Sequence, residues 1–105
     1  MSLFAVICRD QAGKLQTRLD TRDAHLAFLK AQPGLRMAGP LIEEGEMRGS
    51  LLIVEAETLT QVKDWAAGDP YALAGVYATV SIHEYAWGLG PPEPSPAQTP
   101  EPGNG

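Results

Sequence analysis

One histidine and one aspartate are the residues of this chain best suited to acid–base chemistry. His25 lies in a segment with helical spacing, and Asp69 lies between Gly68 and Pro70 at the end of a second such segment. An imidazole titrates near neutral pH, and a carboxylate that accepts a hydrogen bond from one ring nitrogen fixes its tautomer. If the fold brings the two side chains together, they form a pair able to move a proton.

Three nearby residue types could bind the molecule on which such a pair acts. Arg22, one helical turn before His25, could hold a carboxylate or phenolate with its planar guanidinium, or it could pair with a neighbouring aspartate instead. Ser50 could add a hydroxyl group, and Tyr71 an aromatic wall. A serine nucleophile is not predicted, because the glycine-x-serine-x-glycine turn that exposes such a serine is absent.

Structural roles compete with the chemical ones at both central residues. His25 could pack at the margin of the core beside Phe28 and Leu29, with one ring nitrogen bonded to a backbone carbonyl. An aspartate after glycine and before proline is what a helix N-cap requires. Asp69 can therefore cap a helix and orient His25 only if its carboxylate has an oxygen available for the imidazole.

Neither a metal nor another cofactor is predicted. A metal site at His25 and Asp69 would need a third ligand, and no ligand spacing supplies one. Cys8 is the only cysteine and lies in an apolar strand pattern, so it reads as a buried thiol without a disulfide partner. His83, between Ile82 and Glu84, reads as a packing or rim residue.

Composition predicts one small domain followed by a tail. Residues 88–105 hold six of the nine prolines in the 105-residue chain and few apolar side chains, so we expect a disordered Pro/Gly-rich tail there. The predicted folding unit is residues 1–87. A unit of this size has a modest core, and association with a second copy would cover more apolar surface.

Charge and hydropathy exclude two classes of partner. The formal net charge is −5, and the eight Lys and Arg residues are scattered, whereas nucleic-acid binding requires a basic cluster. The start of the chain lacks the features of a signal peptide, and no apolar run is long enough to cross a membrane. We therefore expect no nucleic acid, no membrane and a cytoplasmic location.

Hydrophobic periodicity, together with Gly, Pro and capping signals, predicts the helices and strands that carry His25 and Asp69. Thr58 and Gln61 have the spacing of a capping box, and Gly39-Pro40 interrupts an edge strand. The expected elements, in chain order, are strand 3–8, helix 21–32 capped by Asp20 or Thr21, edge strand 35–41, an acidic turn 43–46, strand 50–56, helix 58–68, a short helical turn 69–74 and strand 77–87.

This order, β-α-β-β-α-β, predicts an α+β ferredoxin-like fold with a four-stranded antiparallel sheet and both helices on one face. The first and third strands are central in that fold, and here both are apolar on two faces. Two helices cover only one face, so we expect a homodimer packed through the open sheet face. A row of aromatic residues (Tyr77, Tyr85 and Trp87) is predicted near that contact.

Several segments, in this order, resemble the YCII-related domain family over about residues 3–87. They are Thr21-Arg22-Asp23-Ala24-His25-Leu26, Ala38-Gly39-Pro40, Gly49-Ser50-Leu51-Leu52-Ile53-Val54-Glu55-Ala56 and Asp69-Pro70-Tyr71-Ala72-Leu73-Ala74-Gly75-Val76-Tyr77. The resemblance implies a dimeric α/β barrel. It also implies that His25 and Asp69 correspond to the active-site histidine and aspartate of the family. Arg22 would correspond to the arginine that usually lies three positions before that histidine, and Gly39-Pro40 to the glycine-proline at the end of the second strand.

The expected function is that of a small-molecule enzyme. His25, oriented by Asp69, would carry out cofactor-independent proton transfer on a small anionic or aromatic compound, in an isomerisation or in a dehydrochlorinase-like elimination of the kind that the resemblance implies. A non-catalytic ligand-binding or accessory dimeric module is the alternative. A cofactor-free oxygenase is a third hypothesis. Such an enzyme would need aromatic residues around a dry pocket, and Trp65 and Tyr71 could supply them.

Overall fold

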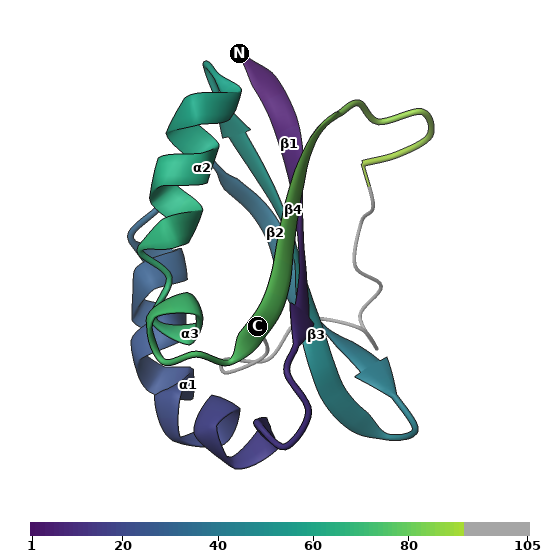
Figure 1. Cartoon of the computed structure of the whole chain (residues 1–105). Coiled ribbons are helices and arrows are strands. Elements are labelled where there is room, and N and C mark those ends of the chain that lie inside the picture. The colour runs from purple at the N-terminus through teal and green to yellow at the C-terminus, as the bar shows by residue number, and fades with distance from the viewer. Residues whose placement is uncertain (92–105) are drawn as a thin grey trace.

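The computed structural model describes residues 1–91. These residues form an α+β fold of two layers, a β-sheet and the helices packed on it (Figure 1). Helices lie on one face of a four-stranded sheet. The elements are β1 (Ser2–Asp10), α1 (Leu15–Lys30), β2 (Leu35–Glu43), β3 (Glu46–Ala56), α2 (Leu59–Ala67), α3 (Pro70–Leu73) and β4 (Tyr77–Tyr85). The ferredoxin-like fold is thus confirmed. Residues 92–105 of the predicted tail lie outside the described residues.

The sheet has the strand order β2-β3-β1-β4, so β1 and β3 are central and β2 is an edge strand, as predicted. All three pairings are antiparallel. Pro40 is tolerated because it lies in the edge strand, where its missing N–H is not needed by a second neighbour. The acidic turn is a two-residue hairpin at Glu44-Gly45, where both residues have positive φ.

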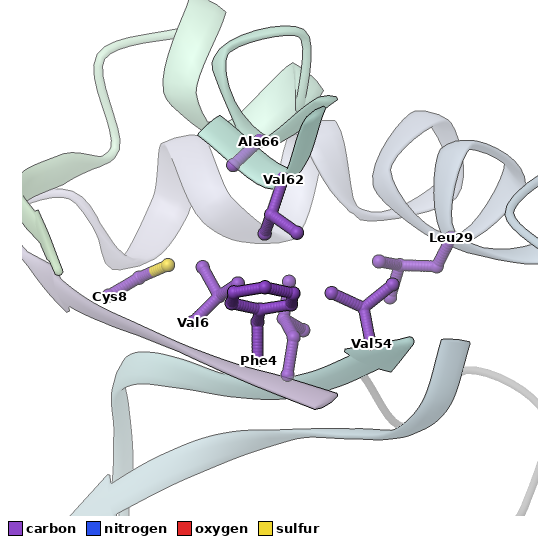
Figure 2. Packing of buried hydrophobic residues seen from close by; sticks show 8 residues of the cluster. Phe4, Val6, Cys8, Leu29, Val54, Val62 and Ala66 are labelled. Atoms are coloured by element: carbon purple, nitrogen blue, oxygen red, sulfur yellow. The ribbon is translucent and has the colours of Figure 1, made fainter. Parts of the chain in front are cut away.

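Alternate residues of the central strands form the core between sheet and helices (Figure 2). Phe4 of β1 pairs with Val54 of β3, and both side chains point toward the helices. Val62 of α2 and Leu29 of α1 pack onto them. Burying such side chains contributes about 1.5–3 kcal/mol each, so this cluster is the main source of stability.

The first helix begins six residues earlier than predicted. It starts at Leu15 rather than at Thr21, and Asp20 lies inside it, accepting a hydrogen bond from Gln16 Nε2 at 2.9 Å instead of capping. The turn that precedes the helix is made by Gly13 in the left-handed region. The prediction was wrong because Lys14, the residue at the N-cap position, supplies no side-chain cap.

The structure confirms the capping residues predicted for the second half of the chain. The Thr58 hydroxyl accepts a hydrogen bond from the Gln61 backbone N–H, and the Gln61 side chain accepts one from the Thr58 N–H. Asp69 caps α3, which begins at Pro70. Asp69 is thereby fixed in place at the start of α3, beside α1.

The last strand differs from the prediction in one respect that matters for the site. A β-bulge pairs Arg9 with Thr79 but Asp10 with Tyr77, so the alternation shifts past Ala78. Tyr77 consequently faces the helices and packs against the core, rather than sharing the open face with Tyr85. The expectation that Tyr77 belongs to the open-face aromatic row was wrong for this reason.

The sheet face opposite the helices is also apolar. Ala5 and Ile53 alternate with the core residues Phe4 and Val54, and both are buried on that face. The chain that follows β4 turns toward this side of the sheet (Figure 1). Met37 remains partly exposed, at 37%. Among the described residues, no helix is long and apolar enough to cross a membrane.

Candidate active site

The structure brings His25 and Asp69 into contact, although 43 residues separate them in the chain. His25 Nδ1, from α1, lies 2.8 Å from Asp69 Oδ1, at the N-cap of α3. An ionised carboxylate can only accept, so Nδ1 carries the hydrogen. In the neutral imidazole, Nε2 then has the free lone pair.

Capping and orientation of the histidine use the same carboxylate without conflict. Asp69 Oδ1 also accepts a hydrogen bond from the Tyr71 backbone N–H at 2.9 Å, which is the cap of α3. Asp69 Oδ2 lies 3.2 Å from Tyr77 Oη. Both oxygens are therefore bonded, and the position of the carboxylate is determined from three directions.

The pair is buried in the single chain. His25 has no exposed surface and Asp69 is 2% exposed. The ring of Tyr71 stacks on the imidazole, with centroids 3.8 Å apart and an interplanar angle of 14°. Among the residues described, His25 Nε2 has no hydrogen-bond partner. A buried nitrogen without a partner costs about 1–3 kcal/mol, and such a group is often kept for a functional reason.

Arg18 is the residue of this region that sequence reasoning missed. Its side chain is fully buried, and its Nη2 donates to the Gly49 carbonyl and to Ser50 Oγ, both at 2.5 Å. Its guanidinium carbon lies 4.5 Å from the centroid of the Tyr71 ring. The available signal was spacing, because Arg18 lies two helical turns before His25 and so on the same side of the helix.

Ser50 and Tyr77 connect Arg18 to the histidine–aspartate pair. Tyr77 Oη lies 3.2 Å from Ser50 Oγ as well as from Asp69 Oδ2. A phenol has one hydrogen, so it donates to Asp69 when the Ser50 hydroxyl donates to it. Burial raises the pKa of Tyr77 well above its usual value, which keeps the phenol protonated as a donor.

Three further residues were predicted to contact a substrate, namely Arg22, Gly39 and Pro40. Arg22 is half-buried and near Tyr71, whose pKa is raised by burial, an effect that the positive charges of Arg18 and Arg22 only partly oppose. Pro40 is paired with Ser50 across the sheet and so faces the helices, whereas Gly39 is paired with Leu51 and faces the opposite side. Substrate contacts for these three residues remain predictions.

Two further side chains, those of Trp65 and Cys8, belong to the hydrophobic core or pack against it. Trp65 packs against the core and stacks on Phe28, with centroids 5.1 Å apart. Cys8 is buried, and burial raises the pKa of its thiol to about 12, so the thiolate is not formed near neutral pH. Within residues 1–91, no three His, Cys, Asp or Glu side chains are grouped so as to hold a metal ion.

Comparison with known proteins identifies relatives over almost all of the folded part. An uncharacterized protein of Haemophilus influenzae is 39% identical over 92 residues, covering 78% of this chain and 94% of that protein. Protein YciI of Escherichia coli is 36% identical over 93 residues, covering 79% of this chain and 95% of that protein.

Solved structures show the same fold. The 5-chloro-2-hydroxyhydroquinone dehydrochlorinase TftG of Burkholderia phenoliruptrix, in complex with 2,5-dihydroxybenzoquinone, is similar with a TM-score of 0.75 and 35% identity, covering 82% of this chain and 95% of that chain. A NIPSNAP domain protein of Burkholderia xenovorans shares the fold alone, with a TM-score of 0.52 and 14% identity, covering 89% of this chain and 100% of that chain. The YCII-related domain matches residues 2–86. The chain belongs to the YCII-related domain family.

Proposed function

We propose that this protein is a small-molecule enzyme in which His25, oriented by Asp69, transfers a proton without a cofactor. The reaction class is an isomerisation or an elimination, and the substrate class is a small anionic or aromatic compound. The proposal rests on the hydrogen bonding of the two nitrogens of the imidazole ring. Nδ1 is held by Asp69 at 2.8 Å, while Nε2 is buried and has no partner among the described residues.

The proposed step uses both nitrogens. Nε2 accepts a proton from the substrate, and Asp69 stabilises the imidazolium that forms. In an elimination, the electron pair of the broken bond to hydrogen moves into the substrate and expels the leaving group. In an isomerisation, the imidazolium returns the proton to a different atom of the same molecule.

The substrate must reach an imidazole that has no exposed surface in the single chain. Tyr71 covers one face of the ring and belongs to α3, a helix of four residues. Gly75, which follows α3, has positive φ and fills no space with a side chain. We propose that a movement of Tyr71, together with α3, opens the site to the substrate.

The relatives support the substrate class. TftG is a dehydrochlorinase and was solved with a dihydroxybenzoquinone, a single-ring compound. Arg18 and Arg22 place positive charge near the Tyr71 ring, which favours an anionic substrate. Fold alone does not establish the reaction, so the proposal depends on the chemistry of the pair.

The test compares two histidine variants on a panel of chlorinated hydroxyaromatic compounds and small lactones. Chloride release and incorporation of solvent deuterium are measured for the native protein, His25→Ala and His83→Ala. His83 is exposed on β4, so its variant is the matched control. Turnover should fall about 10²–10⁴-fold in His25→Ala only. Undiminished turnover in His25→Ala would contradict the proposal.

The alternative is a non-catalytic ligand-binding module, and the complete burial of the pair favours it. In that case His25 and Asp69 stabilise the junction of α1 and α3. The native protein would then bind members of the panel without turning any of them over or exchanging their protons.

We also propose that a second copy covers the open face of the sheet. Apolar side chains of the central strands reach that face, and Met37 and Tyr85 are exposed there at 37% and 39%. Light scattering coupled to gel filtration should give the mass of a dimer, and a monomer mass at micromolar concentration would contradict this.

A further inference from the structure

Two hydroxyl groups connect the guanidinium of Arg18 to the carboxylate of Asp69. Ser50 Oγ lies 2.5 Å from Arg18 Nη2, and Tyr77 Oη lies 3.2 Å both from Ser50 Oγ and from Asp69 Oδ2. Ser50 belongs to β3 and Tyr77 to β4, so the connection spans β1, which lies between these strands in the sheet. We call Ser50 Oγ and Tyr77 Oη the hydroxyl bridge. The reaction proposed above uses neither of them.

The two ends of the hydroxyl bridge determine the direction of its hydrogen bonds. A guanidinium can only donate, so the Ser50 oxygen accepts from Arg18 and the Ser50 hydrogen is left for Tyr77. An ionised carboxylate can only accept, so the Tyr77 hydrogen goes to Asp69. The reverse arrangement, in which Tyr77 donates to Ser50, would leave Asp69 Oδ2 without a donor among the described residues. Buried polar atoms without a partner are costly, so the first direction is favoured.

Both hydroxyl hydrogens are used inside the protein. Ser50 has no exposed surface, and its one hydrogen is directed to Tyr77. Burial raises the pKa of Tyr77, so its phenol stays protonated and keeps its one hydrogen on Asp69. Neither hydrogen is available to a substrate. Ser50, which the sequence predicted to contact the substrate, thus has a different set of partners in the structure.

The hydroxyl bridge competes with His25 for the charge of Asp69. The carboxylate accepts from His25 Nδ1 and from the Tyr71 backbone N–H through Oδ1, and from Tyr77 through Oδ2. Each donor that stabilises the carboxylate makes it a weaker acceptor for the others. Hydrogen bonds in series polarise one another, so donation by Ser50 strengthens the bond from Tyr77 to Asp69. Without the hydroxyl bridge, Asp69 would hold the imidazole hydrogen more strongly.

We propose that Ser50 and Tyr77 are positioning residues that limit how strongly Asp69 binds the imidazole of His25. This role rests on the proposed function, in which His25 takes a proton and later releases it. A carboxylate that stabilises the imidazolium too strongly slows the release, and general acid–base catalysis is most efficient when the proton affinity of the base suits both steps. Arg18 contributes by fixing the direction of the bridge, because it makes Ser50 an acceptor at one end and a donor at the other.

The test follows the hydrogen on His25 Nδ1 by NMR, at a pH where the ring is neutral and with His25→Ala used to assign the signal. A stronger hydrogen bond moves such a signal downfield, and a longer or broken one moves it upfield. Tyr77→Phe should move the signal downfield, because Asp69 loses a competing donor. Ser50→Ala should move it in the same direction by a smaller amount, because Tyr77 still donates but is no longer polarised. A purely structural role predicts the opposite sign, since looser packing lengthens the bond between His25 and Asp69.

A double variant distinguishes a bridge from two independent effects. Ser50 acts through Tyr77, so the double variant Ser50→Ala, Tyr77→Phe should move the signal no further than Tyr77→Phe alone. Ser81→Ala and Tyr85→Phe are the matched controls, because both residues are exposed on β4, and neither should move it. An upfield or unchanged signal in Tyr77→Phe, an unchanged signal in Ser50→Ala, or additive movements in the double variant would overturn the proposal.

The same experiment is independent of turnover, because the signal is measured in the resting protein. Undiminished turnover in His25→Ala would contradict the proposed function whatever the signal does. A signal that Tyr77→Phe does not move would overturn the role of the hydroxyl bridge and leave His25 as a base. If Tyr77→Phe does not fold, Ser50→Ala decides: a downfield movement supports the proposal, and an upfield or absent movement overturns it.

Discussion

The phenol oxygen of Tyr77 lies 3.2 Å from Asp69 Oδ2, the carboxylate oxygen that does not contact His25. This contact completes the hydrogen bonding of Asp69, whose other oxygen is bonded to the imidazole and to the start of α3. The position of the histidine ring therefore depends on a residue in β4 as well as on the helices.

Tyr77→Phe should lower the free energy of unfolding by about 1–3 kcal/mol, because a buried carboxylate oxygen loses its donor. Urea unfolding measures the change. Tyr85→Phe is the control, since Tyr85 is on the same strand but 39% exposed, and it should change stability by no more than about 0.5 kcal/mol. Equal effects of the two variants would contradict the assignment.

Arg18→Met should destabilise the fold by about 3–5 kcal/mol, because it leaves the Asp10 carboxylate buried without its opposite charge. The double variant Arg18→Met, Asp10→Asn should recover part of that loss, since both charges are then absent. A double-mutant cycle from urea unfolding gives the coupling. Additive effects of the two substitutions would show that the groups do not interact.

Gly49→Ala should lower the free energy of unfolding by about 1–3 kcal/mol. A methyl group on Gly49 would overlap the backbone carbonyl of Cys8 on the neighbouring strand, which cannot move without breaking the sheet. Gly39→Ala, in the adjacent strand, meets nothing within 4 Å. Its stability should be unchanged or up to about 1 kcal/mol higher, and a loss equal to that of Gly49→Ala would contradict the packing described.

Stability should decline as the pH rises above about 9. The ordinary pKa of a thiol is 9.0, whereas burial raises the pKa of Cys8 to about 12 in the folded protein. Between these values the folded state holds a proton that the unfolded state has released. The free energy of unfolding then falls with pH, by at most about 1.4 kcal/mol per unit from this one group.

Urea unfolding at pH 8, 9 and 10 tests the alkaline decline. Cys8→Ala should show a shallower slope between pH 9 and 10. The buried tyrosines, Tyr71 and Tyr77, whose pKa values are also raised, add to the slope at higher pH in both proteins. An identical slope in the native protein and Cys8→Ala over this range would contradict the burial of the thiol.

The parts of this fold that local sequence determines were predictable. A capping box at Thr58 and Gln61 and an N-cap followed by proline at Asp69 each use residues within a few positions, so their patterns carry the structure. The central strands were recognisable because β1 and β3 are apolar on two faces. The order of the sheet followed from these elements and was confirmed.

The parts that depend on distant contacts were not predictable. Arg18 belongs to the polar network because it donates hydrogen bonds to Gly49 and Ser50, about thirty residues away in the chain. The start of its helix was also missed, because no residue with a capping side chain marks that start. Tyr77 faces the helices because of a bulge between β1 and β4, which alternation within β4 alone does not reveal. The contacts of Arg18 and the orientation of Tyr77 are both determined by tertiary contacts rather than by local sequence preference.

The tautomer of His25 tests the central claim most directly. ¹⁵N-resolved NMR of the imidazole rings, with His25→Ala used to assign the signals, reports which ring nitrogen carries the hydrogen when the ring is neutral. The account predicts the hydrogen on Nδ1, bonded to Asp69, and an Nε2 with a free lone pair; the preference should be lost in Asp69→Ala. A neutral ring with its hydrogen on Nε2 would contradict the account, because Nε2 could then not accept a proton from a substrate.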